Sequence, residues 1–323
     1  MCTAIVNGIY FGRNLDLDFS YGEGVTITPQ NFPLTFYHQR NLNTHFAMIG
    51  MAYAKGKYPL YYDATNEHGL SAAGLRFVEN CVYHEPRRGK INIASFELIP
   101  FLLGQCKRVR ETVALLENMN VTSDWVSKDL PPTPLHWMIA DDTQSITVES
   151  VGEGLKVYEN PVGVLTNNPP FPTQLWHLKQ YMKVSPKSPK NQFAPNLELS
   201  PDSLGMGGMG LPGDFSSASR FVRAAFVNNN SIFQGEEGEQ VNQFFHILDS
   251  VAQVHGCVQV GEKAYEITRY SSCCNGKTGM YYFTTYHDRQ IRGVGLFDQN
   301  YQGESLIRLG EGLPSQSPFF RRL

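Results

Sequence analysis

Apolar and β-branched residues at the start of the chain form two short runs that predict a pair of strands. The runs span residues 2–6 and 9–13 and flank an Asn-Gly pair. Asn-Gly between two such runs favours a two-residue hairpin turn, because a type I′ turn needs positive φ at both central positions. In that register Cys2 lies directly opposite Arg13. The pattern therefore predicts a cysteine beside an arginine at the beginning of the first sheet.

The rest of the chain shows groups of strands and groups of helices in turn. Strands are expected at about 24–28, 46–50, 71–77, 136–140, 145–151, 155–159 and 162–166, with Tyr- and Thr-rich antiparallel strands between 264 and 296. The spacing of apolar residues predicts helices at about 95–105, 108–119, 214–228 and 241–254, the first with a kink or break at Pro100. This order favours antiparallel sheets with helices grouped on their faces over a doubly wound sheet.

Composition and charge exclude several classes of protein. The 323 residues are 41% hydrophobic, 12% aromatic and 18% charged, the opposite of a disordered or coiled-coil chain. The formal net charge of −3, without a long run of one sign, argues against a nucleic-acid partner. No apolar stretch approaches the roughly 20 residues of a membrane span, and no signal-peptide segment follows Met1. Six cysteines without a signal sequence are expected to be reduced thiols, so a cytoplasmic location is predicted.

Patterns that could indicate a cofactor or a metal are rejected. Residues 205–210 match a dinucleotide-binding glycine pattern, but no apolar strand precedes them and Leu-Pro-Gly follows where a helix should begin. Cys273 and Cys274 are adjacent instead of being spaced as metal ligands, and no two histidines are four residues apart. His136 and His246 each lie in an apolar run and are expected in the core. We therefore predict no cofactor and no metal.

Cys2 is the most chemically distinctive residue of the chain. If Met1 is removed, which is common before a small residue, Cys2 carries both a thiol and a free α-amine. An α-amine has an ordinary pKa of about 7.7–8.0, so it can act as a general base near neutral pH. One residue then supplies nucleophile and base, as in N-terminal threonine nucleophiles, and a neighbouring Arg13 would favour the thiolate. The alternative is that Cys2 is only a small buried apolar residue at the start of a strand.

Six segments that stand in order along the chain carry a family resemblance. They are Met1-Cys2-Thr3-Ala4, Phe11-Gly12-Arg13-Asn14-Leu15-Asp16, Asn66-Glu67-His68-Gly69-Leu70, Ala73-Gly74-Leu75, Gly163-Val164-Leu165-Thr166-Asn167-Asn168-Pro169 and Gly210-Leu211-Pro212-Gly213-Asp214-Phe215-Ser216-Ser217-Ala218-Ser219-Arg220-Phe221. Together they resemble the choloylglycine hydrolase family, the bile salt hydrolases and penicillin V acylases, from residue 1 to about residue 300. The resemblance implies an α+β fold, the αββα sandwich of N-terminal-nucleophile hydrolases, with two stacked antiparallel sheets in a single domain over residues 1–323.

The resemblance also implies a role for each of five polar residues. Cys2 would be the nucleophile and its own amine the base, while Arg13 and Asp16 would orient the thiol and the amine. Asn167 would offer its side-chain amide to the oxyanion, and Arg220 would complete the polar cluster. These residue types suit amide hydrolysis, because a thiolate that attacks an amide needs donors where negative charge develops, and one such donor is worth about 3 to 4 kcal/mol. The alternative for both arginines is a surface salt bridge.

Position 76 departs from the family pattern. After Ala73-Gly74-Leu75, bile salt hydrolases usually carry asparagine and penicillin acylases tyrosine, whereas this chain has Arg76. The main-chain N–H at this position would still serve the oxyanion. The guanidinium would either pair with the carboxylate of glycine or the sulfonate of taurine, or point to solvent. The resemblance also implies that three apolar residues line the steroid side of the pocket, namely Leu15, Leu130 and Leu135.

The function implied by the resemblance is the hydrolysis of conjugated bile acids, which are small amphipathic anions, without a cofactor. Glycine or taurine would be released through a thioester acyl-enzyme. Two alternatives stay open: the same machinery acting on penicillin V or another acyl amide, and a noncatalytic carrier of amphipathic anions. The resemblance implies a homotetramer, in which the Pro-, Gly- and Ser-rich segment 184–212 would be an assembly arm. The preferences for glycine or taurine and for steroid hydroxylation, and any residual penicillin V activity, stay open as well.

Overall fold

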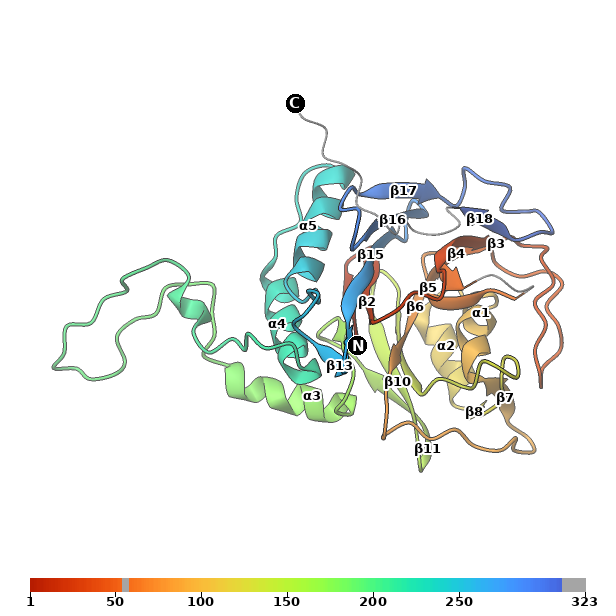
Figure 1. The fold of residues 1–323 in the computed structure, drawn as a ribbon, viewed down its shortest axis with the longest axis horizontal. Coiled ribbons are helices and arrows are strands. Elements are labelled where there is room, and N and C mark those ends of the chain that lie inside the picture. Colours follow the sequence, from red (N-terminus) through yellow and green to blue (C-terminus); the bar gives the residue numbers. More distant parts are fainter. Residues whose placement is uncertain (54–57, 310–323) are drawn as a thin grey trace.

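Two antiparallel β-sheets stack face to face in the computed structural model, which describes residues 1–53 and 58–309 (Figure 1). The six-stranded sheet has the order β12 (Val164–Leu165), β1 (Cys2–Asn7), β2 (Tyr10–Leu17), β15 (Ile267–Asn275), β16 (Met280–Thr285) and β17 (Arg292–Gly295). The eight-stranded sheet has the order β11 (Gly154–Glu159), β10 (Ser145–Val151), β9 (Leu135–Ala140), β6 (Ser71–Arg76), β5 (Leu60–Asn66), β4 (Met48–Tyr53), β3 (Gly24–Thr28) and β18 (Ile307–Leu309). Two small sheets pair β7 (Ile91–Ala94) with β8 (Met119–Thr122), and β13 (Gln259–Gly261) with β14 (Ala264–Tyr265).

Helices cover the outer face of each sheet (Figure 1). On the six-stranded sheet lie α4 (Ser217–Asn230) and α5 (Glu237–Asp249), and on the eight-stranded sheet lie α1 (Leu98–Leu103) and α2 (Val109–Leu116). The other helical segments are α3 (Phe171–His177), η1 (Ser95–Glu97), η2 (Leu178–Tyr181) and η3 (Met206–Gly208). None of the helices in the described part of the chain is long and apolar enough to cross a membrane. The predicted αββα sandwich is confirmed.

Side-chain alternation along the strands creates two apolar clusters. The first fills the space between the sheets and reaches under α4 and α5; it contains Cys2, Leu15 and, from β6, Leu75. The second lies between the eight-stranded sheet and the α1–α2 layer, and contains Ala72 of the same strand β6 and Trp137. Successive residues of a strand point to opposite faces, so one strand contributes to both clusters. Cys2 therefore lies in the apolar layer between the two sheets.

The hairpin at the start of the chain has a different register from the predicted one. Cys2 pairs with Leu15, so the two turn residues are Gly8 and Ile9. Only Gly8 of these two has a positive φ, 55°, which is the pattern of a type II′ turn with glycine at its first central position. The prediction that Cys2 lies directly opposite Arg13 is therefore wrong. Because the partner has moved by two residues, the Cys2 and Arg13 side chains still lie on the same face, as diagonal neighbours.

Two local predictions in the helical regions are wrong. Pro100 does not break its helix, because it is the third residue of α1 and the first turn of a helix needs no N–H donor there.

His136 is buried as expected, with Nε2 2.9 Å from the carbonyl oxygen of Thr166. His246 is exposed instead, since helical rotation turns it outward between its buried neighbours Phe245 and Ile247.

The segment 184–212 extends away from the layered body as a long loop (Figure 1). Its glycine-rich part forms the short helix η3, and the next helix begins only at Ser217. The glycine-rich part therefore lacks the strand–turn–helix context of a dinucleotide site. Gly207 lets two parts of the loop meet: a Cβ on it would lie 2.0 Å from the carbonyl oxygen of Lys187 and 2.3 Å from that of Ser185. The glycines here serve backbone packing within the loop.

Candidate active site

Cys2 is held at the edge of the interior by main-chain contacts. It begins strand β1 and is only 4% exposed. Its main-chain N–H donates to Oδ1 of Asn167 at 2.9 Å. Asn167 lies two residues beyond β12, the strand that pairs with β1, so the two residues meet across neighbouring strands of one sheet.

Asn167 forms hydrogen bonds through its main chain and through both ends of its side-chain amide. Its N–H donates to Oγ of Ser217 at 2.8 Å, and its carbonyl oxygen accepts from Nε2 of Gln174 at 2.6 Å. The side-chain Oδ1 accepts from Cys2 N and from Nη2 of Arg220, while Nδ2 donates to the carbonyl oxygen of Arg76 at 2.8 Å. These contacts determine the orientation of the amide, and one of its two N–H donors is left for another acceptor.

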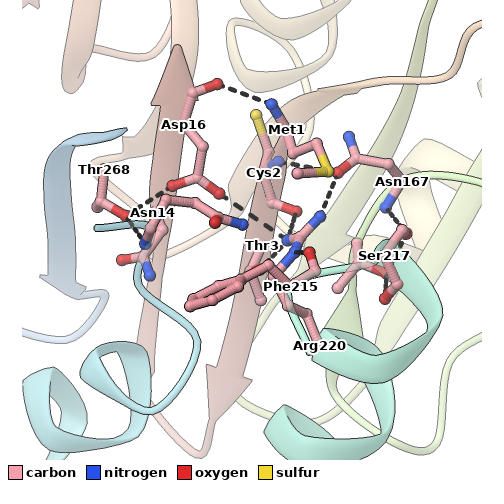
Figure 2. A network of polar contacts seen from close by, with 12 residues as sticks. Met1, Cys2, Thr3, Asn14, Asp16, Asn167, Phe215, Ser217, Arg220 and Thr268 are labelled. Carbon is pink, nitrogen blue, oxygen red and sulfur yellow. Dashed lines mark hydrogen bonds and ion pairs between the residues drawn. The ribbon is translucent and has the colours of Figure 1, made fainter. Parts of the chain in front are cut away.

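Arg220 connects the start of β1 to helix α4 (Figure 2). It lies on the first turn of α4, after Ser216, whose side chain caps the helix by accepting from Ser219 N. Its Nη1 donates to the Cys2 carbonyl oxygen and to Thr3 Oγ1, each at 2.6 Å. The side chain is fully buried, so the surface salt bridge considered for Arg220 is excluded.

Asp16 lies on the opposite face of β2 from Leu15, toward α4. Its Oδ1 accepts from Oγ1 of Thr268 at 2.7 Å, and its Oδ2 lies 3.9 Å from Nη1 of Arg220. Burial raises the pKa of Asp16, and the positive charge of Arg220 opposes this shift. Asp16 Oδ2 is buried without a hydrogen-bond partner among the described residues. The carboxylate is therefore able to accept another donor.

The terminal ammonium group of Met1 lies between two oxygen atoms. It donates to the carbonyl oxygen of Asp16 at 2.8 Å, as drawn in Figure 2, and to Oε1 of Glu266 at 2.6 Å. Glu266 and Thr268 were not identified from the sequence. Glu266 immediately precedes strand β15 and Thr268 is the second residue of that strand, and no local motif distinguishes either residue.

Arg13 is fully buried between the sheets. Its Nη1 donates to the carbonyl oxygens of Tyr62 and Gly74, each at 2.7 Å, so the guanidinium group lies between strands β5 and β6. Tyr62 is the extra residue of a β-bulge opposite β4, which turns its carbonyl group out of the strand ladder. The surface salt bridge considered for Arg13 is excluded, and its Nη2 has no partner within residues 1–53 and 58–309.

Groups from both sheets act on the positive charge of Arg13, with Cys2 and Asp16 in its own sheet and Asp63 in the other. Burial alone would lower the pKa of the guanidinium, but the thiol of Cys2, Asp63 and Asp16 act against this and the pKa is raised. Asp63 accepts from Tyr270 OH at 2.5 Å and from Tyr281 OH at 2.8 Å. Burial raises the pKa of Asp63, and Arg13 opposes the shift. Asp63 was not predictable as part of the site, since nothing near it in the sequence indicates its tyrosine partners.

The residues expected to contact substrate fall into different surroundings. Leu15 is buried directly opposite Cys2, in the same cluster. Leu135 belongs to the second cluster, where it pairs with Arg76 across β6 and β9, and Leu130 lies partly buried in the loop before β9. The Arg76 side chain is exposed and makes no hydrogen bond or ion pair with the residues that the structure describes. The structure therefore places only Leu15 beside the thiol.

Comparison with known proteins identifies the family. The family described as "Linear amide C-N hydrolases, choloylglycine hydrolase family" matches residues 2–308. The chain belongs to the choloylglycine hydrolase family. A bile salt hydrolase/transferase of Lactiplantibacillus plantarum is 49% identical to this chain over 310 residues, which cover 95% of this chain and 96% of the relative. A bile salt hydrolase/transferase of Clostridium perfringens is 36% identical over 319 residues, 95% of each chain.

Two solved structures have the same fold as this chain. A mutant of the conjugated bile acid hydrolase from Clostridium perfringens superposes with a TM-score of 0.90 at 32% identity and covers 99% of both chains. Penicillin V acylase from Agrobacterium tumefaciens shares the fold at 17% identity, with a TM-score of 0.76, over 96% of this chain and 91% of its own. This family member therefore has the N-terminal-nucleophile hydrolase fold and is a hydrolase that acts on linear amide C–N bonds.

Proposed function

We propose that this protein hydrolyses the amide bond of glycine- or taurine-conjugated bile acids through a thioester on Cys2. The observation that carries the proposal is the set of contacts at Cys2. Asn167 and Arg220 bind its main chain, and Leu15 lies directly across from it. The relatives at 49% and 36% identity, named bile salt hydrolase/transferase, match nearly the whole chain, which supports the same substrate class.

Removal of Met1 would convert the main-chain nitrogen of Cys2 into a free α-amine. That nitrogen is already 2.9 Å from Asn167 Oδ1. An ammonium group in this place would also offer donors to the buried, unpartnered Oδ2 of Asp16. We therefore assign the α-amine as the general base, with Asn167 and Asp16 as the groups that orient it.

The thiol of Cys2 is the proposed nucleophile. The α-amine takes its proton, and the thiolate is stabilised by Arg13, which lies on the same face of the sheet and has a free Nη2. The thiolate attacks the amide carbonyl carbon, and the α-ammonium then gives its proton to the leaving nitrogen of glycine or taurine. Water, activated by the same amine, hydrolyses the thioester and releases the bile acid.

Two donors are proposed for the oxyanion of the tetrahedral intermediate. One is the second N–H of Asn167 Nδ2, since the first donates to Arg76. The other is the main-chain N–H of Arg76. Phe77 N donates to the carbonyl oxygen of Pro134, the residue before β9. The N–H groups of successive residues in a strand point to opposite sides, so the N–H of Arg76 points away from β9. Leu15 is the proposed apolar contact for the steroid, together with Leu130 and Leu135, and the free guanidinium of Arg76 is the proposed contact for the charged head group.

Turnover of three substrates tests the proposal. We expect the mature protein to release glycine from glycocholate and taurine from taurocholate faster than it cleaves penicillin V. Preferential cleavage of penicillin V would assign the chain to the acylases instead. Iodoacetamide should modify Cys2 and abolish hydrolysis. A noncatalytic carrier would bind both bile acids without releasing either amine, before and after the modification.

Acyl transfer to an amine is a second candidate activity. The relatives from Lactiplantibacillus plantarum and Clostridium perfringens are both named hydrolase/transferase. A thioester on Cys2 can be attacked by an amine as well as by water, so the same acyl-enzyme serves both reactions. Formation of glycocholate from taurocholate in the presence of free glycine, followed by mass spectrometry, tests this activity.

We further propose that the loop 184–212 joins copies of the chain in a homotetramer. The loop extends from the body (Figure 1) and presents large apolar side chains to solvent, with Phe193 83% and Leu204 95% exposed. Exposed apolar residues gathered on one projecting segment are typical of a surface that is covered by a partner.

A further inference from the structure

Met1 occupies a small polar site built from the end of strand β2 and from Glu266. Its ammonium group donates to Glu266 Oε1 at 2.6 Å and to the Asp16 carbonyl oxygen at 2.8 Å. Its carbonyl oxygen accepts from the main-chain N–H of Asp16 at 2.9 Å. Met1 therefore pairs with Asp16 as one additional rung of the β1–β2 hairpin (Figure 2). The buried carboxylate of Glu266 faces the positive charge of Met1.

The side chain of Glu266 forms no other hydrogen bond or ion pair with residues 1–53 and 58–309. The residue is only 5% exposed, its Oε1 binds nothing except the ammonium of Met1, and its Oε2 has no partner in the described part of the chain. A buried carboxylate that lacks a partner is costly, so the fold gains from a cation bound at this point. Loss of Met1 would remove the cation and leave the carboxylate, together with the N–H and carbonyl groups of Asp16.

These three groups match a free α-amino acid. We propose that, in the mature protein, the place of Met1 binds an amino acid such as glycine, with its ammonium on Glu266 and the Asp16 carbonyl oxygen and its carboxylate on the Asp16 N–H. The proposal rests on the proposed function, because it requires removal of Met1. The site lies one peptide bond from Cys2 N, which is the group that exchanges a proton with the amine half of the substrate.

Because the site lies next to Cys2, an amino acid bound there can act as the acceptor in acyl transfer. A bound ammonium is no nucleophile, so one proton first passes to the Glu266 carboxylate. The resulting amine attacks the thioester carbon: the C–N bond forms, the C–S bond breaks and the thiolate of Cys2 leaves. The second proton of the amine passes to the α-amine of Cys2. The products are the new amide, a thiolate–ammonium pair on Cys2 and a protonated Glu266, which returns its proton to water.

Inhibition of hydrolysis by free glycine tests the site, with the mature enzyme and taurocholate as substrate. Glycolate has the carboxylate of glycine but a hydroxyl in place of the ammonium, so it serves as the matched ligand. We expect glycine to bind more tightly than glycolate in the wild type. Glu266→Gln should weaken glycine binding on the order of tenfold, because a charge-assisted hydrogen bond is lost, and should leave glycolate binding unchanged. The ratio of glycocholate to cholate formed at fixed glycine should fall in the same variant.

Glu97→Gln is the control. Glu97 is also buried and accepts two main-chain N–H groups, from Tyr37 at 2.9 Å and Ala94 at 3.0 Å, but it lies at the start of the α1 layer. This variant should keep the wild-type preference for glycine over glycolate. Equal binding of glycine and glycolate by the wild type would overturn the proposal, and that measurement needs no variant to fold. Unchanged glycine binding in Glu266→Gln would overturn it as well.

Direct calorimetric binding of glycine and glycolate separates this inference from the proposed function. A mature protein that hydrolyses no conjugated bile acid but binds glycine through Glu266 would refute the proposed function alone. A protein that hydrolyses taurocholate normally but shows no preference for the ammonium ligand would refute the amino-acid site alone. Retention of Met1 in active protein, seen by mass spectrometry, would also refute the site, since Met1 would fill it.

Discussion

Asn167 and Arg76 are joined by a hydrogen bond from Nδ2 of the asparagine to the main-chain carbonyl oxygen of the arginine, at 2.8 Å. The same asparagine accepts from Cys2 N at 2.9 Å. One side chain therefore connects the end of β6, in the eight-stranded sheet, to the start of β1, in the six-stranded sheet. The amide group of Asn167 therefore contacts both Cys2 and Arg76.

Replacement of Asn167 by alanine should slow the chemical step. We expect kcat to fall by a factor on the order of 100 to 1,000, with a smaller change in KM, because a donor to the oxyanion acts mainly in the transition state. Steady-state kinetics with glycocholate measure both constants. Asn229→Ala, an exposed asparagine of helix α4, is the matched control and should behave as the wild type. A rise in KM alone would assign Asn167 to substrate binding.

Maturation should be required for activity. Retained Met1 keeps the nitrogen of Cys2 in a peptide bond, so the general base is absent. Mass spectrometry of active protein should find Cys2 at the terminus, and full activity with Met1 attached would contradict this. Cys2→Ala should lose essentially all turnover but keep its circular dichroism spectrum. Cys2→Ser should be nearly as inactive, because a hydroxyl is far less ionised than a thiol near pH 7.

Arg76→Ala should weaken the use of charged conjugates and leave hydrolysis possible. The main-chain N–H survives the substitution, while the free guanidinium is lost. A charge-assisted hydrogen bond to the head group corresponds to a loss of roughly 10- to 150-fold in kcat/KM for glycocholate, and a neutral cholyl amide should be unaffected. Added salt should slow the wild type more than the variant. Equal losses on both substrates would leave Arg76 without a part in head-group recognition.

The buried Asp63 should make the free energy of unfolding depend on pH. Its pKa is raised in the folded state, mainly by burial, so the folded protein binds the proton more tightly than the unfolded chain does. Stability should therefore fall as pH rises from about 4, the ordinary pKa of an aspartic acid, through the raised value. Urea unfolding of the wild type and of Asp63→Asn, over a series of pH values, isolates this contribution. A wild-type minus variant difference that does not change with pH would refute it.

The apolar side chains of the loop 184–212 should support assembly. Replacing both Phe193 and Leu204 by serine removes two of its most exposed apolar groups, so the chain should elute as a smaller species in size-exclusion chromatography with light scattering. Met182→Ser, an exposed apolar residue just before the loop, is the control. A monomeric wild type, or a double variant that stays tetrameric, would refute the role of the loop.

The layered fold was predictable because its elements carry local patterns. Strands β3 and β10 lie within the predicted ranges, since alternating or continuous apolar residues bounded by turns define a strand locally. The register of the first hairpin was not predictable. The Asn-Gly pair favours a turn at residues 7 and 8, whereas the structure has the turn at residues 8 and 9. The observed register sets Leu15, a buried apolar residue, opposite Cys2, where the predicted register would have set Arg13.

The sequence by itself determined which residues could carry the chemistry. The thiol of Cys2 lies one residue from the chain start, and the ordered motifs led to Arg13, Asp16, Asn167 and Arg220. Only the tertiary structure decided what these residues contact. Glu266 meets the terminal ammonium across 265 positions, and Asp63 meets Tyr281 across 218. Such contacts depend on how two sheets stack, and a lone polar residue in a strand has the same local pattern whether or not a partner faces it.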